Sequence, residues 1–384
     1  MSSPKNPVLF TSQEKKQYSR HILLEEIGVS GQYKLKQARV LVIGAGGLGC
    51  PVLQYLALAG VGTLGIVDGD TVCETNLQRQ FLFTYTDVGK SKALQAKSRL
   101  QAQNPFIHIE AFSFFLTTEN IMEVLSAYDI IVDGTDNFAT RYLVNDACVL
   151  LDKTLVFGSI FKFEGQVSVL NFQATSGTYR CLYPQPPKQD TVLSCSEVGV
   201  LGVLPGIIGS YQANEVIKLI TGIGIPLVNT LLCINALDLT QYKLTFSRNP
   251  TQPTALLSNY ETFCGVSSSK ENRNKIHYIS YHQYEHNSQD YTLIDVREDW
   301  EWEREHLLDS INIPLEDLTD WLMDTINEDK HNDKSIKKQF VFCCTTNTRS
   351  EKAYETVLSF LEKSNKAYDL ISFSVLEESL SVLL

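Results

Sequence analysis

The sequence predicts an α/β protein with a doubly wound, mostly parallel sheet in a large first domain, followed by a smaller second α/β domain. Two observations indicate this class. Short β-branched runs alternate with segments of helical periodicity through the first part of the chain, and the same alternation resumes near its C-terminus. Strands that alternate with helices pair in parallel, and helices then cover both faces of the sheet. The length of 384 residues also exceeds that of a typical single domain.

The first domain is expected to span residues 1–248. Charged residues on one side and apolar residues on the other predict a helix over 13–36. Apolar, β-branched runs predict strands at 39–43, 63–67, 107–112, 129–133, 155–157, 166–171 and 231–235. Helices are expected between them, at 50–59, 90–103, 118–127 and 204–221.

A change of composition separates this domain from the next. Residues 249–275 contain Asn-Pro, Gln-Pro and a run of serines, which indicates an interdomain linker. The second domain is expected to span residues 276–384. Its predicted strands lie at 291–296 and 339–342, and its predicted helices at 318–327 and 350–363.

Charge and composition exclude several classes of protein. The formal net charge of -11 works against non-specific nucleic-acid binding, so no nucleic-acid partner is expected. The polar first twenty residues do not resemble a signal peptide, and the uncharged stretch 40–67 is interrupted by glycines, so no membrane segment is expected. The nine scattered cysteines favour reduced thiols over a disulfide framework. These features predict a cytoplasmic protein.

A glycine-rich loop lies between the first predicted strand and the helix after it. Gly44, Gly46 and Gly49 form the pattern G-x-G-x-x-G, with Gly47 inside it, and Asp68 ends the next predicted strand. Glycines let the backbone approach a phosphate, a helix N-terminus favours an anion, and the carboxylate can bind ribose hydroxyls. The pattern predicts a nucleotide site without distinguishing ATP from NAD, so an NAD-dependent oxidoreductase stays an alternative.

Polar residues beyond this loop favour ATP. Asn76, Arg79 and Lys92 supply the charge and hydrogen bonds that a triphosphate needs, which is more than the two phosphates of NAD require. Asp136 and Asn137 follow another predicted strand, at the edge where open α/β sheets bind ligands. A carboxylate there can hold Mg2+. Singly, Arg79 is as consistent with a surface charge, and Asp136 with a helix N-cap. The ordered set predicts an Mg-ATP site.

In this order the residues resemble the MoeB/ThiF/HesA family, the bacterial relatives of ubiquitin-activating enzymes. The resemblance covers about residues 10–250 and implies a Rossmann-like adenylation domain. The segments that carry it are Tyr18–Arg20, Gly44–Gly49, Asp68–Asp70, Asn76–Gln80, Gly89–Lys92, Asp133–Asn137, Gly158, Glu164–Gln166, Cys195 and Gly206–Ser210.

The resemblance implies roles for several of these residues. Asp68 would bind ribose, Asp136 would bind Mg2+, and Arg79 and Lys92 would contact phosphates. Arg20 would reach the triphosphate of a neighbouring subunit, which implies a homodimer. The substrate would be a ubiquitin-like sulfur-carrier protein ending in Gly-Gly, whose carboxylate attacks the α-phosphorus of ATP. The implied ATP-binding residues are Gly44, Gly46, Gly47, Gly49, Asp68, Asp70, Asn76, Arg79, Lys92, Asp136 and Asn137.

Members of this family commonly carry two C-x-x-C pairs that hold a structural zinc ion. Here only Cys181 and Cys264 remain, and Thr178 and Glu261 stand where each pair would begin. Two thiolates with a Thr and a Glu make a poor tetrahedral site, so zinc is not expected. Cys195 would lie in the loop that crosses the active site, as a cysteine able to bond the carrier; an inert thiol is the alternative.

The second domain contains a reactive-cysteine pattern. Cys343 and Cys344 end a predicted strand, and Arg349 opens the next predicted helix, so that a helix dipole and an arginine both favour a thiolate at Cys344. The pattern resembles the rhodanese loop C-x-x-G-x-R and implies that Cys344 carries sulfur. Asn347 replaces the usual glycine; because asparagine tolerates left-handed conformations, the loop is compatible with activity. A non-catalytic docking domain is the alternative.

Together the two domains predict an adenylyltransferase that is also a sulfurtransferase. The adenylated carrier would receive persulfide sulfur from Cys344, supplied by a cysteine desulfurase or thiosulfate, and would end as a thiocarboxylate. Cys195 would resolve the intermediate. Molybdopterin synthesis is favoured as the pathway, with thiamine synthesis and tRNA thiolation close behind. A carrier-binding scaffold without activity is the alternative from another class.

Overall fold

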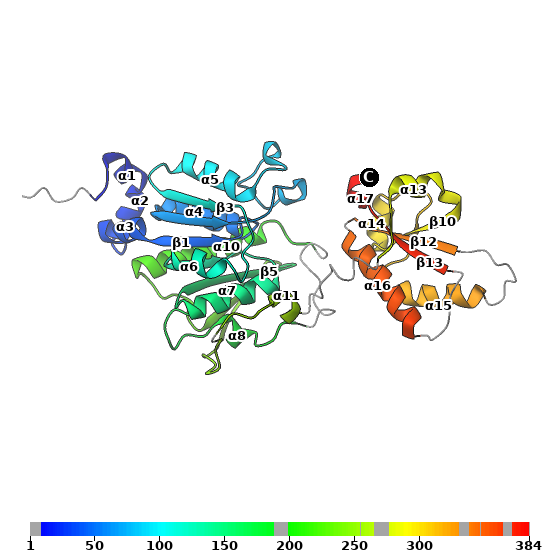
Figure 1. Ribbon diagram of the computed structural model, residues 1–384. Helices are drawn as coiled ribbons and strands as arrows, with labels where there is room; N and C mark the ends of the chain where they lie inside the picture. The colour runs from blue at the N-terminus through cyan, green and yellow to red at the C-terminus, as the bar shows by residue number, and fades with distance from the viewer. Residues whose placement is uncertain are drawn as a thin grey trace, which may run out of the picture. The chain divides into compact units, whose positions relative to one another are not determined.

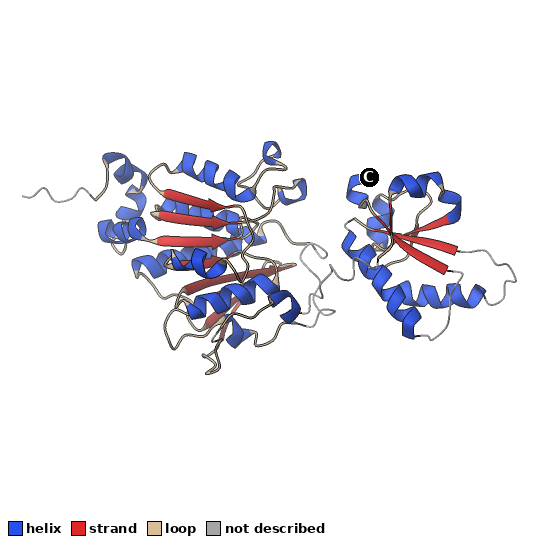
Figure 2. Cartoon of the chain, in the orientation of Figure 1, coloured by secondary structure: helices blue, strands red, loops and turns tan. Residues whose placement is uncertain are grey.

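The computed structural model describes residues 9–187, 199–253, 255–264, 276–329, 338–345, 347–363 and 371–383. The chain divides into two compact units, Met1–Ser267 and Ser268–Leu384. Both are α/β, as predicted, with helices packed beside the strands of each sheet (Figures 1 and 2). No helix of the described part is long and apolar enough to cross a membrane.

The first unit is built on a sheet that has eight strands in the described residues, in the order β3-β2-β1-β4-β5-β6-β7-β8. The first five strands along the chain pair in parallel, and the last three pair antiparallel. The strands are β1 (Arg39–Ile43), β2 (Thr63–Val67), β3 (His108–Phe112), β4 (Ile130–Asp133), β5 (Thr154–Phe161), β6 (Glu164–Leu170), β7 (Thr230–Asn235) and β8 (Gln241–Thr245).

Helices cover both faces of this sheet. They are α1 (Ser12–Gln17), α2 (Ser19–Ile22), α3 (Gly28–Gln37), α4 (Gly49–Ala59), α5 (Lys92–Gln103), α6 (Ile121–Ser126), α7 (Phe138–Leu150), α8 (Tyr179–Leu182), α10 (Leu204–Thr221) and α11 (Tyr260–Phe263), with short 3-10 turns at Glu74–Asn76 and Tyr85–Asp87.

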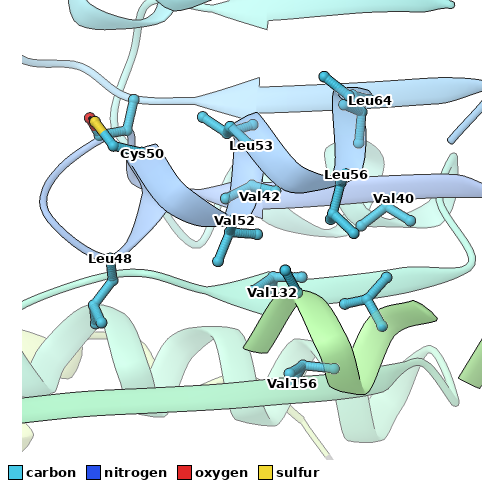
Figure 3. Packing of buried hydrophobic residues seen from close by; sticks show 14 of the residues in the cluster. Val40, Val42, Leu48, Cys50, Val52, Leu53, Leu56, Leu64, Val132 and Val156 are labelled. Carbon is cyan, nitrogen blue, oxygen red and sulfur yellow. The ribbon is translucent and has the colours of Figure 1, made fainter. Parts of the chain in front are cut away.

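Alternate residues of β1 supply two separate cores. Val40 and Val42 pack with Leu53 and Leu56 of α4 on one face, as Figure 3 shows. Leu41 and its neighbours pack against α7 on the other face. Because successive side chains of a strand point to opposite faces, an all-apolar strand requires cover on both. Strand β1 also has β2 on one side and β4 on the other, so the strand order reverses beside it.

The observed elements of this unit differ from the predicted ones in several places. Helix α7 was not among the predicted helices. The expected helix over 13–36 is three helices. The first break is at Tyr18, whose buried side chain donates its hydroxyl to Asn104, and the second ends at Gly28, which has φ +55. Strand β8 was not predicted; all five of its residues are exposed, so it lacks an apolar pattern. Helix α11 lies within the predicted linker 249–275, and its Tyr260 is buried in the core of the first unit. The proposed domain boundaries stay a prediction.

The second unit has a smaller sheet, in which every strand pair is parallel within the described residues, in the order β11-β10-β12-β13-β9. The strands are β9 (Tyr278–Ile279), β10 (Tyr291–Asp295), β11 (Ile311–Asn312), β12 (Lys338–Cys343) and β13 (Ile371–Leu376). The helices are α13 (Tyr281–His286), α14 (Asp299–Arg304), α15 (Leu318–Asp329), α16 (Asn347–Lys363) and α17 (Leu380–Leu383), with a 3-10 turn at Ser288–Asp290. Separate apolar clusters cover its two faces.

Candidate active site

A pocket opens where β1, β2 and β4 end, beside the point at which the strand order reverses. Open α/β sheets bind ligands at such a point. The pocket brings together most of the residues predicted from the sequence, namely Gly44, Gly46, Gly47, Asp68, Asp70, Arg79, Lys92, Asp136 and Asn137. An apolar wall completes it, formed by residues that include Phe114, Phe115, Leu116, Ile160 and Val200.

The glycine-rich loop needs glycine for close packing. Gly44 has φ +91, and a Cβ there would lie 2.8 Å from the carbonyl oxygen of Gly134 in the loop after β4. A Cβ at Gly49 would lie 1.9 Å from the carbonyl oxygen of Gly44. Gly49 therefore shapes the loop without lining the pocket. Helix α4 begins there with no side-chain cap among the described residues, so the amide groups of its N-terminus can bind an anion.

Asp68 ties this loop to the end of β2. One carboxylate oxygen accepts the Ala45 amide at 2.7 Å, and the other accepts the Asp70 amide at 2.8 Å. Burial raises the pKa of Asp68, while these two hydrogen bonds and Lys92 act in the opposite direction. The carboxylate thus lies at the pocket with its orientation fixed.

Two cations reach the pocket from the segment after β2. The Lys92 ammonium is nearly buried and lies 2.9 Å from the half-exposed Asp70 carboxylate. Arg79 donates to the Thr75 carbonyl at 3.0 Å. Asn76 does not line the pocket; its carbonyl accepts the amides of Arg79 and Gln80, so it shapes the turn that carries the arginine.

Asp136 is an exposed carboxylate that lines the pocket and has no hydrogen bond or ion pair to any other described residue. It is not the N-cap of α7, because Asn137 accepts the Thr140 amide at 2.9 Å and fills that role. Mg2+ is commonly held by one or two carboxylates together with substrate phosphates. An unpaired carboxylate beside a phosphate-binding loop therefore fits a magnesium ion.

Two buried polar residues of the pocket were given no role by the sequence analysis. Gln80 is 4% exposed, and its Oε1 has no partner among the described residues. Arg141 lies in α7, is 9% exposed and donates to the Thr135 carbonyl at 2.9 Å. A sequence signal existed for Arg141: it stands four residues after the Asn137 cap, on a helix that is otherwise largely apolar.

Besides Gly49 and Asn76, two further predicted residues are not placed at the pocket. Arg20 is exposed in α2 and does not line it. Cys195 lies outside the described residues.

Cys181 and Cys264, the two cysteines that remain of the family's zinc-binding pairs, lie in different environments. The Cys181 sulfur accepts hydrogen bonds from the amides of Asn249 and Thr178 at 3.2 and 3.3 Å. Burial raises the pKa of Cys181, but these hydrogen bonds outweigh it and leave the pKa below its usual value. Cys264 lies in the aromatic core, where burial raises its pKa to about 11. No group of three or more His, Cys, Asp or Glu residues that could hold a metal gathers in the described part of the chain. The absence of zinc stays a prediction.

In the second unit, Cys344 directly follows β12 and precedes α16. It is 1% exposed, and its carbonyl accepts the Leu380 amide at 2.9 Å. Arg349, in the first turn of α16, binds the Glu301 carboxylate through two hydrogen bonds of 2.6 and 2.8 Å. The Glu301 carboxylate and Cys344 both raise the pKa of Arg349, so the guanidinium stays charged beside the cysteine.

The neighbours of Cys344 have structural roles. Asn347 begins α16 and donates its side-chain amide to the Glu377 carbonyl at 2.8 Å, which anchors the loop. Cys343 belongs to the apolar cluster on the opposite face of the sheet, and burial raises its pKa well above the usual value. The two adjacent thiols therefore belong to different environments.

Fold and pocket together define a nucleotide-binding α/β protein, joined to a unit in which a cysteine precedes a helix N-terminus. The chain belongs to the ThiF family, whose sequence model matches residues 18–254, and a rhodanese-like domain matches residues 280–378. Its relatives are named as adenylyltransferases and sulfurtransferases, and the chain is an enzyme of this type. This assignment removes the oxidoreductase alternative.

Three relatives illustrate the similarity. A sulfur carrier protein adenylyltransferase of Thermus thermophilus is 50% identical over 67% of this chain and 99% of its own length. A probable adenylyltransferase/sulfurtransferase MoeZ of Mycobacterium tuberculosis is 46% identical over 77% of each chain. The adenylyltransferase and sulfurtransferase MOCS3 of Aedes aegypti is 42% identical over 80% of this chain and 74% of its own.

Solved structures agree on the fold. The crystal structure of PaaA superimposes with a TM-score of 0.55 at 22% identity, covering 65% of this chain and 78% of that one. The crystal structure of Escherichia coli MccB with ATP gives a TM-score of 0.53 at 24% identity, covering 61% and 69%.

Proposed function

We propose that this chain adenylates the C-terminal Gly-Gly carboxylate of a ubiquitin-like sulfur carrier and then converts it to a thiocarboxylate. The observation that carries the proposal is the pocket itself. A phosphate-binding loop, two cations and an unpaired carboxylate meet at one sheet edge, with apolar residues beside them. Nucleotidyl transfer depends chiefly on positioning and charge neutralisation, and this set supplies both.

Each residue has a distinct task in adenylation. Asp68 binds the ribose hydroxyls, the glycine-rich loop binds phosphate, and Arg79 and Lys92 stabilise the negative charge that shifts toward the leaving group. Asp136 would hold a magnesium ion, whose charge would neutralise further phosphate charge. A carboxylate oxygen of the carrier forms a bond to the α-phosphorus, the bond from that phosphorus to the bridging oxygen breaks, and pyrophosphate leaves. The product is an acyl-adenylate.

Exposed apolar side chains on and just before the outermost strand, β8, support a protein substrate. Leu237 and Leu239 are 68% and 70% exposed, and Tyr242 and Leu244 of the outer strand β8 are each about half exposed. An outer strand with exposed apolar residues can bind a partner through its backbone and side chains together. A small carrier with an extended C-terminus suits this surface.

In this proposal the second unit carries out the sulfur-transfer step. A persulfide on Cys344 attacks the acyl carbon, AMP leaves with its electron pair, and an acyl disulfide forms. Cys195 then attacks the Cys344 sulfur and releases the carrier thiocarboxylate. The resulting protein disulfide is reduced by a cellular dithiol. Arg349 and the N-terminus of α16 favour the anionic form of the persulfide. A cysteine desulfurase or thiosulfate is the proposed sulfur donor.

The exposed position of Arg20 supports a homodimer, in which it would serve the pocket of the neighbouring subunit. An apolar groove beside α4 and α10 offers a contact surface, lined by residues that include Tyr55, Phe81, Val203, Ile207 and Tyr211. Of the pathways that use such carriers, we favour molybdopterin synthesis over thiamine synthesis and tRNA thiolation, in the cytoplasm.

The test is thiocarboxylate formation on a purified candidate carrier. The full chain, the carrier, Mg-ATP, thiosulfate and a dithiol reductant are mixed, and the carrier mass is measured. The proposal requires conversion that depends on ATP and on Cys344. Carrier binding with no mass change, for every candidate carrier, would instead identify a scaffold.

A further inference from the structure

Arg141 is a buried cation in the wall of the pocket with no role so far. It lies in α7, is 9% exposed, and packs its guanidinium 5.7 Å from the Phe138 ring centre and 5.8 Å from that of Phe157. Its Nε has no partner among the described residues. Burying a guanidinium is unfavourable unless its charge and its donors are used. Its charge faces that of the buried Asp133 carboxylate, and both Arg141 and Asp136 line the pocket.

Thr135 lies in the turn before Asp136, and its amide, its hydroxyl and its carbonyl are all hydrogen-bonded. The Asp133 carboxylate accepts the Thr135 amide at 2.9 Å and the Thr135 hydroxyl at 2.6 Å. Arg141 donates to the Thr135 carbonyl at 2.9 Å. The buried Asp133 carboxylate therefore binds the amide end of Thr135, and the buried Arg141 guanidinium binds its carbonyl end. The next residue is Asp136, whose own carboxylate has no partner in the described structure.

We infer that Arg141 is a positioning residue that fixes the Thr135–Asp136 turn, so that the Asp136 carboxylate meets the geometry that a magnesium ion demands. Mg2+ requires near-ideal octahedral coordination, and a carboxylate on an unfixed turn meets this requirement poorly. Groups that orient metal ligands typically change metal affinity by about 10–100-fold when removed. The inference rests on the proposed function, because it takes Asp136 as the magnesium ligand.

A second arginine offers a matched control. Arg180 packs 4.9 Å from the ring centres of Tyr142 and Phe263, and it binds Asp146 through two hydrogen bonds of 2.7 Å. Those aromatic residues and Phe157 belong to the same core. Arg180 does not line the pocket. Replacing either arginine disturbs the same core, but only Arg141 contacts the turn that carries Asp136.

The experiment measures binding of a non-hydrolysable ATP analogue by calorimetry, with and without Mg2+, in the full chain. Arg141→Met is expected to raise the Mg2+ concentration for half-saturation by about 10-fold, and to leave Mg2+-free binding of the analogue unchanged. Arg180→Met is expected to lower the melting temperature and leave the Mg2+ requirement unchanged. Arg141→Lys keeps the charge without the planar fork and is expected to give a smaller shift.

An unchanged Mg2+ requirement in Arg141→Met would overturn the inference, as would an equal loss of analogue binding with and without Mg2+. If Arg141→Met does not fold, Arg141→Lys decides alone: a shifted requirement supports the inference, and an unshifted one overturns it. The assay needs no carrier. If the wild-type chain binds the Mg-analogue complex but activates no carrier, the proposed function fails, while the assignment of Arg141 is still decided.

Discussion

The two units of this chain use charged residues in opposite ways. In the first unit, Asp136 faces the pocket with no partner among the described residues, and Arg79 hydrogen-bonds a backbone carbonyl instead of a carboxylate. In the second, Arg349 is bound by Glu301 through both terminal nitrogens, close to a cysteine that is 1% exposed. The first site therefore has charge available for a charged ligand. The second uses its charge to fix a loop around one sulfur atom.

The largest expected effect separates the two sites completely. Cys344→Ser should reduce sulfur transfer from thiosulfate to cyanide to the uncatalysed rate, because hydroxyl oxygen cannot carry a persulfide. Carrier-dependent adenylation should be retained. Both rates are measured on the same preparation. Residual sulfur transfer in the variant would mean that another cysteine carries the sulfur.

Asp136→Asn should have the opposite effect: adenylation should fall, and sulfur transfer should remain. Loss of one preorganised group that stabilises transition-state charge lowers the rate by about 10²–10³-fold in a well-studied case, and Asp136 would act in this way through its magnesium ion. Adenylation should fall by that factor, measured as pyrophosphate release in the presence of carrier. Sulfur transfer to cyanide should not change. If both rates fell together, the two units would not work as separate sites.

Gly44→Ala should destabilise the first unit alone. Its φ of +91 and the carbonyl 2.8 Å from the added Cβ both oppose the methyl group. Strain of this kind costs about 1–3 kcal/mol. Gly89→Ala is the matched control, because it has φ +79 but no atom within 4 Å of the added Cβ. Scanning calorimetry should show a larger shift for Gly44→Ala, confined to one transition. Equal shifts would show that the close contact is unimportant.

A smaller effect should appear in how the stability of the second unit depends on pH. Burial alone would raise the pKa of Glu301, but its hydrogen bonds and ion pair with Arg349 lower it below its usual value of 4.5. Because the folded-state pKa is lowered, this pair stabilises the fold above the unfolded-state pKa and is lost as the pH falls through the folded value. The transition of the second unit should therefore weaken below about pH 4.5. Glu301→Gln should remove that part of the pH dependence; an identical pH profile would contradict it.

The smallest expected effect concerns metal. Because Cys181 accepts backbone hydrogen bonds and Cys264 lies in an aromatic core, dialysis against a chelator should leave the melting temperature of the first unit unchanged. Elemental analysis provides the check. One zinc ion per chain, lost in Cys181→Ala, would show that the prediction of no zinc is wrong.

Motif order predicted most of the pocket, because its residues follow successive strand ends that meet at one sheet edge. Gly44, Asp68 and Asp136 were found in this way. Arg141 was not, and Gln80 was part of a motif but was given no role, because a single arginine or glutamine looks the same in sequence whether it faces solvent or a pocket. The break at Tyr18 and the packing of Tyr260 on Asp146 depend on partners distant in the chain, which local patterns do not reveal.

The central claim is that the pocket activates a carrier carboxylate with ATP. Exchange of labelled pyrophosphate into ATP tests it most directly, because exchange requires reversible formation of the acyl-adenylate. We predict exchange that needs Mg2+ and a carrier ending in Gly-Gly, and that disappears when the final glycine is removed or when Asp136 is replaced by Asn. Exchange that proceeds equally without the carrier, or its absence with every Gly-Gly carrier tested, would contradict this account.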